Sequence, residues 1–387
     1  MPSTSSTDRA EKRARTTTPT RRRFLRSSVA AGTLAATGLA GCTSRIVGSD
    51  DQSPSESDPL KIGVYGGVFK EVLDGALVEP FTEDSGIPAQ SEPQSIGDAM
   101  VKLKQAVDAG EAPVDVVVVA PDARIRGTDM GTWLNYSPDD ISRLDAVIDD
   151  LVAKGDQGDI VGIGGFGWSL NLTTNTEVMD QPLTSWKDLW NDQYASQLAA
   201  NRLPGDGFLL DIAAHTFDEF NGRDSLRTKE DIRAVMERVT GVSPQIGLWW
   251  AQEAEAQQPL REGNIGATQM YNDVSLVMKE KGAPVETRFP EEGGVLNFGS
   301  WTIVRTTNYP DAAKQFVDYA IRSDVQTQIT EQLYSVPTIE ESELNLSDDL
   351  YQKVYGPGPE AAIRPYNRLY LEKEQWLSEQ WKQTVLS

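Results

Sequence analysis

Apolar residues along this chain form two kinds of pattern. Val114–Val119 is a nearly continuous β-branched run, which is typical of a strand buried on both faces of a parallel sheet. Lys61–Tyr65 predicts a shorter strand. Between these strands, apolar positions recur at helical spacing over residues 69–77 and 100–107. This strand–helix–helix–strand order predicts an α/β layer.

The same alternation continues to the C-terminus, with no internal repeat. A chain of 387 residues is long enough for two domains or lobes. Ser185 and Asp188 have the spacing of a helix-capping box. The predicted strands are 170–174, 265–270 and 295–304. One predicted helix begins after Ser185, and the others cover 228–239, 273–281, 312–321, 324–333 and 366–385.

The N-terminal segment predicts export and anchoring. Arg21 and Arg22, followed by Phe24-Leu25, resemble a twin-arginine export signal, and the apolar run from Val29 to Ala40 is too short to span a bilayer. Leu39–Cys42 resembles a lipobox, and Cys42 is the only cysteine. We therefore expect residues 1–41 to be a cleaved lipoprotein signal and Cys42 to carry lipid. The alternative is a chance cysteine after an ordinary signal peptide.

Residues 42–58 are polar and rich in Ser and Asp, which predicts a flexible tether. No later segment has the run of about 18 apolar residues that a membrane helix needs. With one cysteine, no intramolecular disulfide is possible.

Acidic residues dominate the charge. The chain has 36 Lys and Arg against 58 Asp and Glu, a formal net charge of −22. Such a surface repels nucleic acid and anionic lipid headgroups, so nucleic acid is not an expected partner. The acidic residues are dispersed, as at Asp139-Asp140 and Glu291-Glu292. Adaptation to high salt explains this pattern, and attraction of cationic ligands is the alternative.

Motifs for enzymatic chemistry are weak. Gly162–Gly167 satisfies G-x-G-x-x-G, but a strand follows it where a dinucleotide site needs a helix, which favours a crossover between lobes. His215 is the only histidine and no G-x-S-x-G elbow exists, so a structural role is favoured. One histidine and a lipidated cysteine cannot form the usual zinc ligand set. We expect no catalytic residues, no metal and no cofactor.

The aromatic residues are a richer signal. Tyr65, Trp168, Tyr271 and Trp301 lie at or beside predicted strand ends with glycines nearby, where a cleft would be lined. Aromatic faces hold cations or stack on flat rings. Core packing is the alternative for each.

Several segments, in order, resemble extracellular solute-binding proteins of ABC importers, most closely the spermidine/putrescine-binding type. The resemblance covers about residues 58–340. The segments are Tyr65–Gly67, Gly165–Trp168, Leu183–Trp190, Arg261–Gly263, Tyr271-Asn272, Pro290–Gly294 with Trp301, Tyr309–Tyr319 and Tyr334–Thr338.

This resemblance implies a two-lobed periplasmic-binding-protein-like α/β fold that closes around a ligand by hinge motion. The lobes would be residues 58–165 with 297–345, and 166–296 with 346–387. It also implies a monomer without enzymatic activity, lipid-anchored on the extracellular face of the cell membrane, that delivers a small organic solute to ABC permease subunits. A secreted enzyme or a sensory receptor on a related scaffold is the alternative.

The resemblance also implies the site. Tyr65 and the amides of Gly66 and Gly67 would face the cleft from the first lobe. Trp168 and Tyr271 would form aromatic walls, and Asp273 would lie near enough to pair with an amine. Gly299 stands where polyamine binders carry an ammonium-binding aspartate. Asn297 and Trp301 would reshape the pocket for a polyamine-like or related solute.

Overall fold

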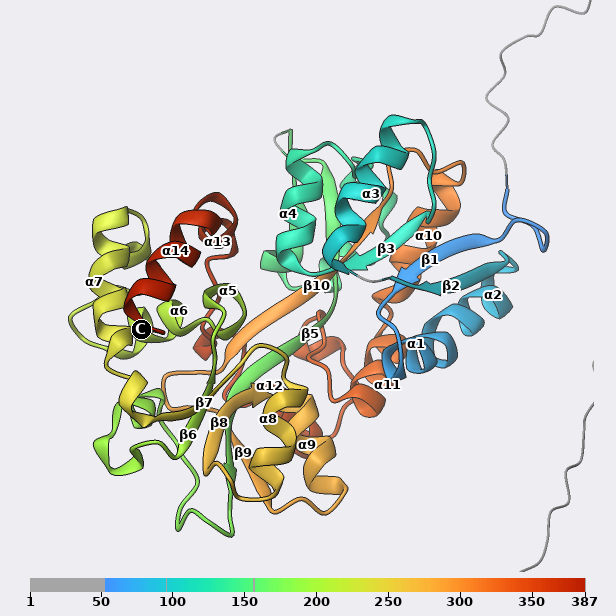
Figure 1. Ribbon diagram of the computed structural model, residues 1–387. Coiled ribbons are helices and arrows are strands. Elements are labelled where there is room, and N and C mark those ends of the chain that lie inside the picture. The colour runs from blue at the N-terminus through green and yellow to red at the C-terminus, as the bar shows by residue number, and fades with distance from the viewer. Residues whose placement is uncertain (1–52, 95, 156, 387) are drawn as a thin grey trace, which may run out of the picture. The chain divides into compact units, whose positions relative to one another are not determined.

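The computed structural model describes residues 53–386 except 95 and 156. The predicted export signal, the lipobox and Cys42 lie outside the described residues. Ten strands of the described chain form one sheet, in which eight follow the order β2-β1-β3-β10-β5-β8-β6-β7 and two, β4 and β9, pair with β5. Figure 1 shows helices on both sides of this sheet.

The strands and helices have the following bounds. The strands are β1 (Leu60–Val64), β2 (Ala89–Pro93), β3 (Val116–Val119), β4 (Val152–Lys154), β5 (Ile160–Asn175), β6 (Leu198–Asn201), β7 (Ile246–Trp250), β8 (Ala267–Tyr271), β9 (Val285–Arg288) and β10 (Val295–Ile303). The α-helices are α1 (Val68–Leu73), α2 (Glu79–Ser85), α3 (Ile96–Asp108), α4 (Pro121–Asp129), α5 (Pro204–Gly207), α6 (Leu209–Thr216), α7 (Lys229–Thr240), α8 (Ala254–Arg261), α9 (Asn272–Glu280), α10 (Pro310–Ala320), α11 (Ser323–Leu333), α12 (Asp348–Tyr355), α13 (Asn367–Glu372) and α14 (Glu374–Thr384). A π-helical turn, Asp74–Val78, joins α1 to α2.

The predicted α/β layer is confirmed. β1 pairs in parallel with β2 and β3, and every residue of β3 is buried, as its continuous apolar pattern predicts. β10 runs antiparallel between β3 and β5. The sheet is therefore mixed, with its antiparallel pairs at the two longest strands.

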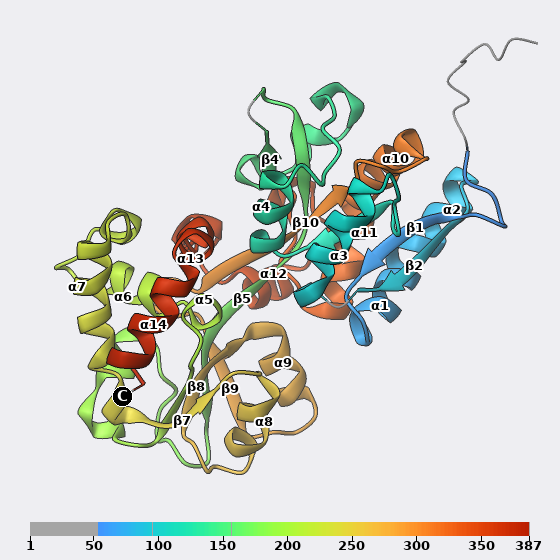
Figure 2. The ribbon, with the colours of Figure 1, turned by 45° about the horizontal axis from the view of Figure 1, so that its top comes forward.

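Two large hydrophobic cores lie along the sheet, and β5 and β10 contribute to both. Phe166 of β5 and Trp301 of β10 belong to the first core, with β1, β3, α10 and α11. Leu170 of β5 and Val295 of β10 belong to the second, with β6, α6, α7 and α14. Figures 1 and 2 show β5 and β10 passing from one group of elements to the other.

The glycines at 162–167 lie inside β5, and no helix follows them. A Cβ on Gly165 would lie 2.7 Å from Nε1 of Trp301, and one on Gly167 would lie 2.5 Å from the Phe298 ring. These glycines allow large side chains of β10 to pack directly on β5. Their place inside a strand excludes the dinucleotide motif, and the close packing of β10 on β5 agrees with the backbone approach that a crossover would need.

The capping box predicted at Ser185 and Asp188 is confirmed. Ser185 and Asp188 form both hydrogen bonds of a capping box at a 3₁₀ helix, Trp186–Trp190. Thr228 caps α7 by accepting a hydrogen bond from the Asp231 amide at 3.1 Å.

Two predicted boundaries differ from the structure. The C-terminal helix is interrupted at Lys373, between α13 and α14. At the end of the predicted tether, the amides and carbonyls of Ser55 and Asp58 form a closed turn, and the Tyr309 hydroxyl donates to Asp58 at 2.6 Å. The body of the protein therefore begins a few residues earlier than the composition indicates.

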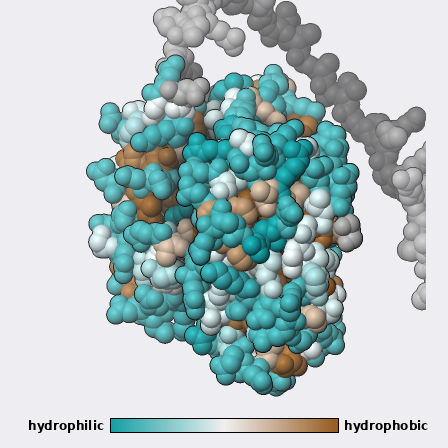
Figure 3. Space-filling view, turned by 90° about the vertical axis from the view of Figure 1, so that its left-hand side faces the viewer, coloured by the Kyte–Doolittle hydropathy of each residue, from teal (hydrophilic) through white to brown (hydrophobic). Residues whose placement is uncertain are grey.

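Within the described residues, no helix is long and apolar enough to cross a membrane. The face of the molecule drawn in Figure 3 is mostly hydrophilic, and its apolar residues form separate small patches.

Candidate functional site

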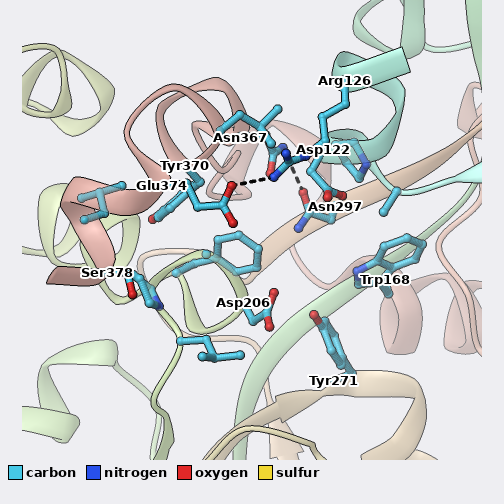
Figure 4. A pocket seen from close by; sticks show the side chains of 18 residues that line it. Asp122, Arg126, Trp168, Asp206, Tyr271, Asn297, Asn367, Tyr370, Glu374 and Ser378 are labelled. Carbon is cyan, nitrogen blue, oxygen red and sulfur yellow. Dashed lines mark hydrogen bonds and ion pairs between the residues drawn. The ribbon is translucent and has the colours of Figure 1, made fainter. Parts of the chain in front are cut away.

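A pocket of about 370 Å³ lies where elements of the two cores meet. The segment after β3 and helix α4 border it on one side, and α5, α13 and α14 border it on the other. Trp168, Tyr271 and Asn297 line it from β5, β8 and β10. Figure 4 shows these side chains directed into the same space. The structure thus brings together three of the residues that the sequence singled out.

The floor of this pocket is aromatic. Tyr271 is the last residue of β8. It pairs with Leu170 of β5, which lies two residues after Trp168. Burial raises the pKa of the Tyr271 hydroxyl well above its usual value, although a hydrogen bond from Trp168 opposes this shift. The hydroxyl is therefore neutral. Phe208 and Tyr370 form a second aromatic pair, edge to face at 5.9 Å.

Two carboxylates line the pocket from different elements. Asp122 is on α4 and Asp206 is on α5. Among the described residues, neither side chain has a hydrogen bond or an ion pair. The Asp206 side chain is exposed to solvent, yet the surrounding protein atoms raise its pKa, and the negative charge of Asp122 raises it further. The two carboxylates repel each other across the pocket.

Sequence reasoning missed Asp122 and Asp206. A local signal exists for each, since both follow a proline at the start of a helix, in Ala120-Pro121-Asp122 and Leu203-Pro204-Gly205-Asp206. Proline is common at the first helical position. Nothing in the sequence places these two helix starts in one pocket.

The pocket contains one further charged pair. Arg126 of α4 binds Glu374 of α14 at 2.8 Å, which neutralises both groups. Asn367 donates to the side-chain oxygen of Asn297 at 3.4 Å. Because Arg126 and Glu374 cancel, Asp122 and Asp206 leave the pocket negative.

Two half-buried acids lie close to Tyr271. Glu253 accepts a hydrogen bond from the Tyr271 amide at 2.7 Å, and burial raises its pKa to about 8. Burial also raises the pKa of Asp273 to about 6. The Oδ1 atom of Asp273 has no hydrogen-bond partner in the described part of the chain. Asp273 does not line the pocket but lies close enough to influence the pKa of Tyr271.

The remaining predicted site residues do not line this pocket. Tyr65 packs edge-on against Phe166 and Trp168, with ring centroids 6.1 and 6.3 Å apart. Gly66 and Gly67 are exposed at the turn after β1.

Trp301 lies in the first core and not at the pocket. Its side chain is fully buried, edge to face with Phe316 at 5.5 Å. Trp301 is in the core because of how β10 packs on β5. The register of the two strands shifts between Gly299 and Ser300, and Trp301 fills the space beside Gly165.

His215 is outside the pocket. Its Nδ1 atom lies 2.7 Å from the main-chain oxygen of Asp211, one helical turn earlier. Among the described residues, no group of three or more His, Cys, Asp or Glu side chains is arranged to hold a metal ion.

Two cores joined by long shared strands, with a polar and aromatic pocket between them, define a solute-binding architecture. The family profile described as bacterial extracellular solute-binding protein matches residues 76–354. The chain belongs to this family, as its sequence motifs predicted.

Curated relatives are similar over most of their length. The gamma-aminobutyric acid-binding protein of Pseudomonas aeruginosa is 23% identical over 289 residues, which are 72% of this chain and 76% of that protein. The spermidine/putrescine-binding periplasmic protein of Escherichia coli is 22% identical over 286 residues, which are 70% of this chain and 76% of that protein.

Solved structures share the fold. The Atu4243–GABA receptor structure superposes with a TM-score of 0.70 at 18% identity and covers 84% of this chain and 96% of that one. The spermidine/putrescine ABC transporter substrate-binding protein of Streptococcus pneumoniae also gives 0.70 at 18% identity, with 84% and 99% coverage. The predicted fold class is thereby confirmed.

Proposed function

We propose that this protein is the solute-binding component of an ABC importer and that its solute carries at least one primary ammonium group. The observation that carries the ligand class is the pair of unpartnered carboxylates, Asp122 and Asp206, facing one aromatic-walled pocket.

The charge and position of Asp122 and Asp206 favour a cationic solute. Two unit charges about 4 Å apart interact by about 4 kcal/mol near a protein surface, so an ammonium between two carboxylates gains considerably more than it would in water. Trp168 and Tyr271 add aromatic faces, which attract cations by about 0.5–2 kcal/mol each. A neutral or anionic solute gains no ion pair from the two carboxylates.

The position of the acids differs from that in the polyamine binders. Gly299 leaves no carboxylate on β10, and a Cβ there would lie 3.5 Å from the Trp168 ring. Asp122 and Asp206 supply negative charge from α4 and α5 instead. Relatives named for gamma-aminobutyric acid and for polyamines share a primary ammonium on a short chain. That shared group is what we assign to this pocket.

We propose two lobes built around these cores, residues 58–165 with 297–345 and residues 166–296 with 346–387; Phe166, at the boundary, packs in the first core. Asp122 belongs to the first lobe and Asp206 to the second. An ammonium bound by both would draw the lobes together, which is the hinge closure that such receptors use.

We propose further that residues 1–41 direct twin-arginine export and that lipid on Cys42 holds the monomeric receptor at the extracellular face of the membrane. A tether raises the local concentration of receptor at its permease. The dispersed acidic residues then serve solubility in salt.

Isothermal titration calorimetry tests the ligand class. Putrescine, spermidine and gamma-aminobutyric acid are compared with a neutral diol of the same length. We expect saturable binding by at least one ammonium solute, none by the diol, and no chemical change in the recovered solute.

The matched variants are Asp206→Asn and, as a control, Asp180→Asn, which removes an exposed acid that is not in the pocket. Asp206→Asn is expected to weaken binding at least about tenfold, since one charge-assisted contact is lost. Equal binding of the diol, or unchanged affinity in Asp206→Asn, would overturn the assignment.

A further inference from the structure

A second cavity, of about 680 Å³, shares no residue with the solute pocket. Its walls come from α4, from the β4–β5 connection and from α13. Arg124, Arg368 and Lys154 line it, together with the acids Asp129 and Asp159. Among the described residues that line this cavity, three are basic and two are acidic, in a chain with a formal net charge of −22.

Arg124 is half-buried, and its guanidinium has no hydrogen bond or ion pair within the described residues. The main chain at Arg124 is held in place by hydrogen bonds. The main-chain oxygen of Arg124 accepts hydrogen bonds from Thr128 and from the Trp133 indole, both at 2.9 Å. Its side chain passes close to Gly162, where a Cβ would lie 3.2 Å from Cδ. A half-buried guanidinium without a hydrogen bond or an ion pair has donors that lack an acceptor.

Arg368 brings a second guanidinium to the same cavity. Burial lowers the pKa of Arg124, and the positive charge of Arg368 lowers it further, which places the two groups within electrostatic reach. Arg368 is only loosely neutralised, since its Nη1 atom is 3.5 Å from Asp129 and 3.7 Å from Glu372. Lys154 is exposed, and no ion pair to it is formed by the described acids. Asp129 and Glu372 offset the charge of Arg368 in part, whereas Arg124 has no ion pair with any described acid.

We propose that this cavity binds a small oxyanion, such as phosphate, sulfate or a carboxylate, between Arg124 and Arg368. Guanidinium groups present parallel N–H donors that match two oxygens of such an anion, and the bonds are charge-assisted. The polar cavity is large enough to keep water around the remaining oxygens. By accepting hydrogen bonds from both arginines, the anion would link α4 to α13.

Equilibrium dialysis with radiolabelled inorganic phosphate tests this site in the mature chain, at constant ionic strength maintained with sodium chloride. We expect saturable binding of about one phosphate per chain, displaced by sulfate and by acetate. Arg124→Gln is expected to weaken binding at least about tenfold, because a charge-assisted bidentate contact is lost. Arg261→Gln removes an exposed arginine that does not line this cavity and is the matched control.

Non-saturable binding, or equal affinity in Arg124→Gln and the parent, would overturn the proposal. Equal weakening in Arg261→Gln would also overturn it, because it would indicate general attraction to surface cations. Circular dichroism reports whether each variant is folded. If Arg124→Gln does not fold, the half-exposed Arg368 allows the same comparison with Arg368→Gln. The ammonium solute is left out, so failure here leaves the proposed function untouched.

Discussion

Arg126 of α4 and Glu374 of α14 form an ion pair of 2.8 Å between the two sides of the solute pocket. Three residues along the same helix, Asp129 pairs with Arg368 of α13 at 3.5 Å. Both pairs join α4, which packs on β3, to an element that packs in the second core. Their side chains are about half exposed, so the pairs are accessible to salt.

The first prediction concerns these pairs. Glu374→Gln is expected to weaken solute binding by about twofold to fivefold at low ionic strength, since exposed ion pairs contribute about 0–1 kcal/mol. The difference should vanish at high salt, where the parent pair is screened. Titration calorimetry at two salt concentrations measures both effects.

The control for that prediction is Arg227→Gln, which breaks a comparably exposed pair with Asp224 away from the pocket. It should leave affinity unchanged at either salt concentration. A loss in Glu374→Gln that persists at high salt would show that Glu374 contacts the solute directly and that the ion pair is incidental.

The second prediction concerns pH and Asp206. The surrounding protein atoms and the charge of Asp122 raise the pKa of this carboxyl, so it is protonated over a wider acidic range than a free aspartate. Only the ionised form attracts an ammonium. Affinity should therefore increase as pH rises through the raised pKa, and binding should release protons below that pH. Asp206→Asn should flatten this dependence, as measured by calorimetry in buffers of different ionisation enthalpy. An unchanged pH profile in Asp206→Asn would contradict the expectation.

The third prediction concerns stability and Glu253. Its pKa is raised from 4.5 to about 8 because burial disfavours the charged form. Between these two values the folded state holds the proton more tightly than the unfolded state does. The contribution of Glu253 is therefore full below about pH 4.5 and is lost as pH rises toward 8, by at most about 1.4 kcal/mol per pH unit.

Glu253→Gln keeps an oxygen for the Tyr271 amide but cannot ionise. The free energy of unfolding of this variant should fall less between pH 5 and pH 8 than that of the parent, as measured by urea denaturation. Glu177→Gln, at an exposed acid away from Tyr271, is the control and should follow the parent. Parallel pH profiles for Glu253→Gln and the parent would show that Glu253 is ionised in the folded protein.

Local patterns in the sequence were sufficient for much of the fold. The β-branched run in β3, the capping box at Ser185 and the glycines of β5 all depend on neighbours within a few positions. The sequence also singled out Trp168 and Tyr271; Tyr271 ends β8 as expected, whereas Trp168 lies in the middle of β5 beside Gly167.

The acidic part of the pocket depends on tertiary structure. Asp122 and Asp206 are 84 positions apart in the chain, and only the packing of α4 and α5 at one pocket relates them. Trp301 shows the converse. Its neighbours in sequence indicate a cleft, but the register shift after Gly299 and the space beside Gly165 place it in the first core. Neither the packing nor the shift has a signature in the local sequence.

The last prediction restores the missing acid on β10. Gly299→Asp places a carboxylate beside Trp168, where a Cβ would lie 3.5 Å from the indole ring and 3.2 Å from Val118, a contact that small side-chain movements can relieve. A solute with two or more ammonium groups then gains a further ion pair, whereas one with a single ammonium does not. We expect the affinity ratio of putrescine to gamma-aminobutyric acid to rise at least about tenfold, since one charge-assisted contact contributes about 1.5–3 kcal/mol. Gly299→Asn has the same size without the charge and separates this effect from crowding. If both variants change the ratio equally, the effect at Gly299 comes from side-chain size and not from charge. Ammonium binding would then depend on Asp122 and Asp206 alone.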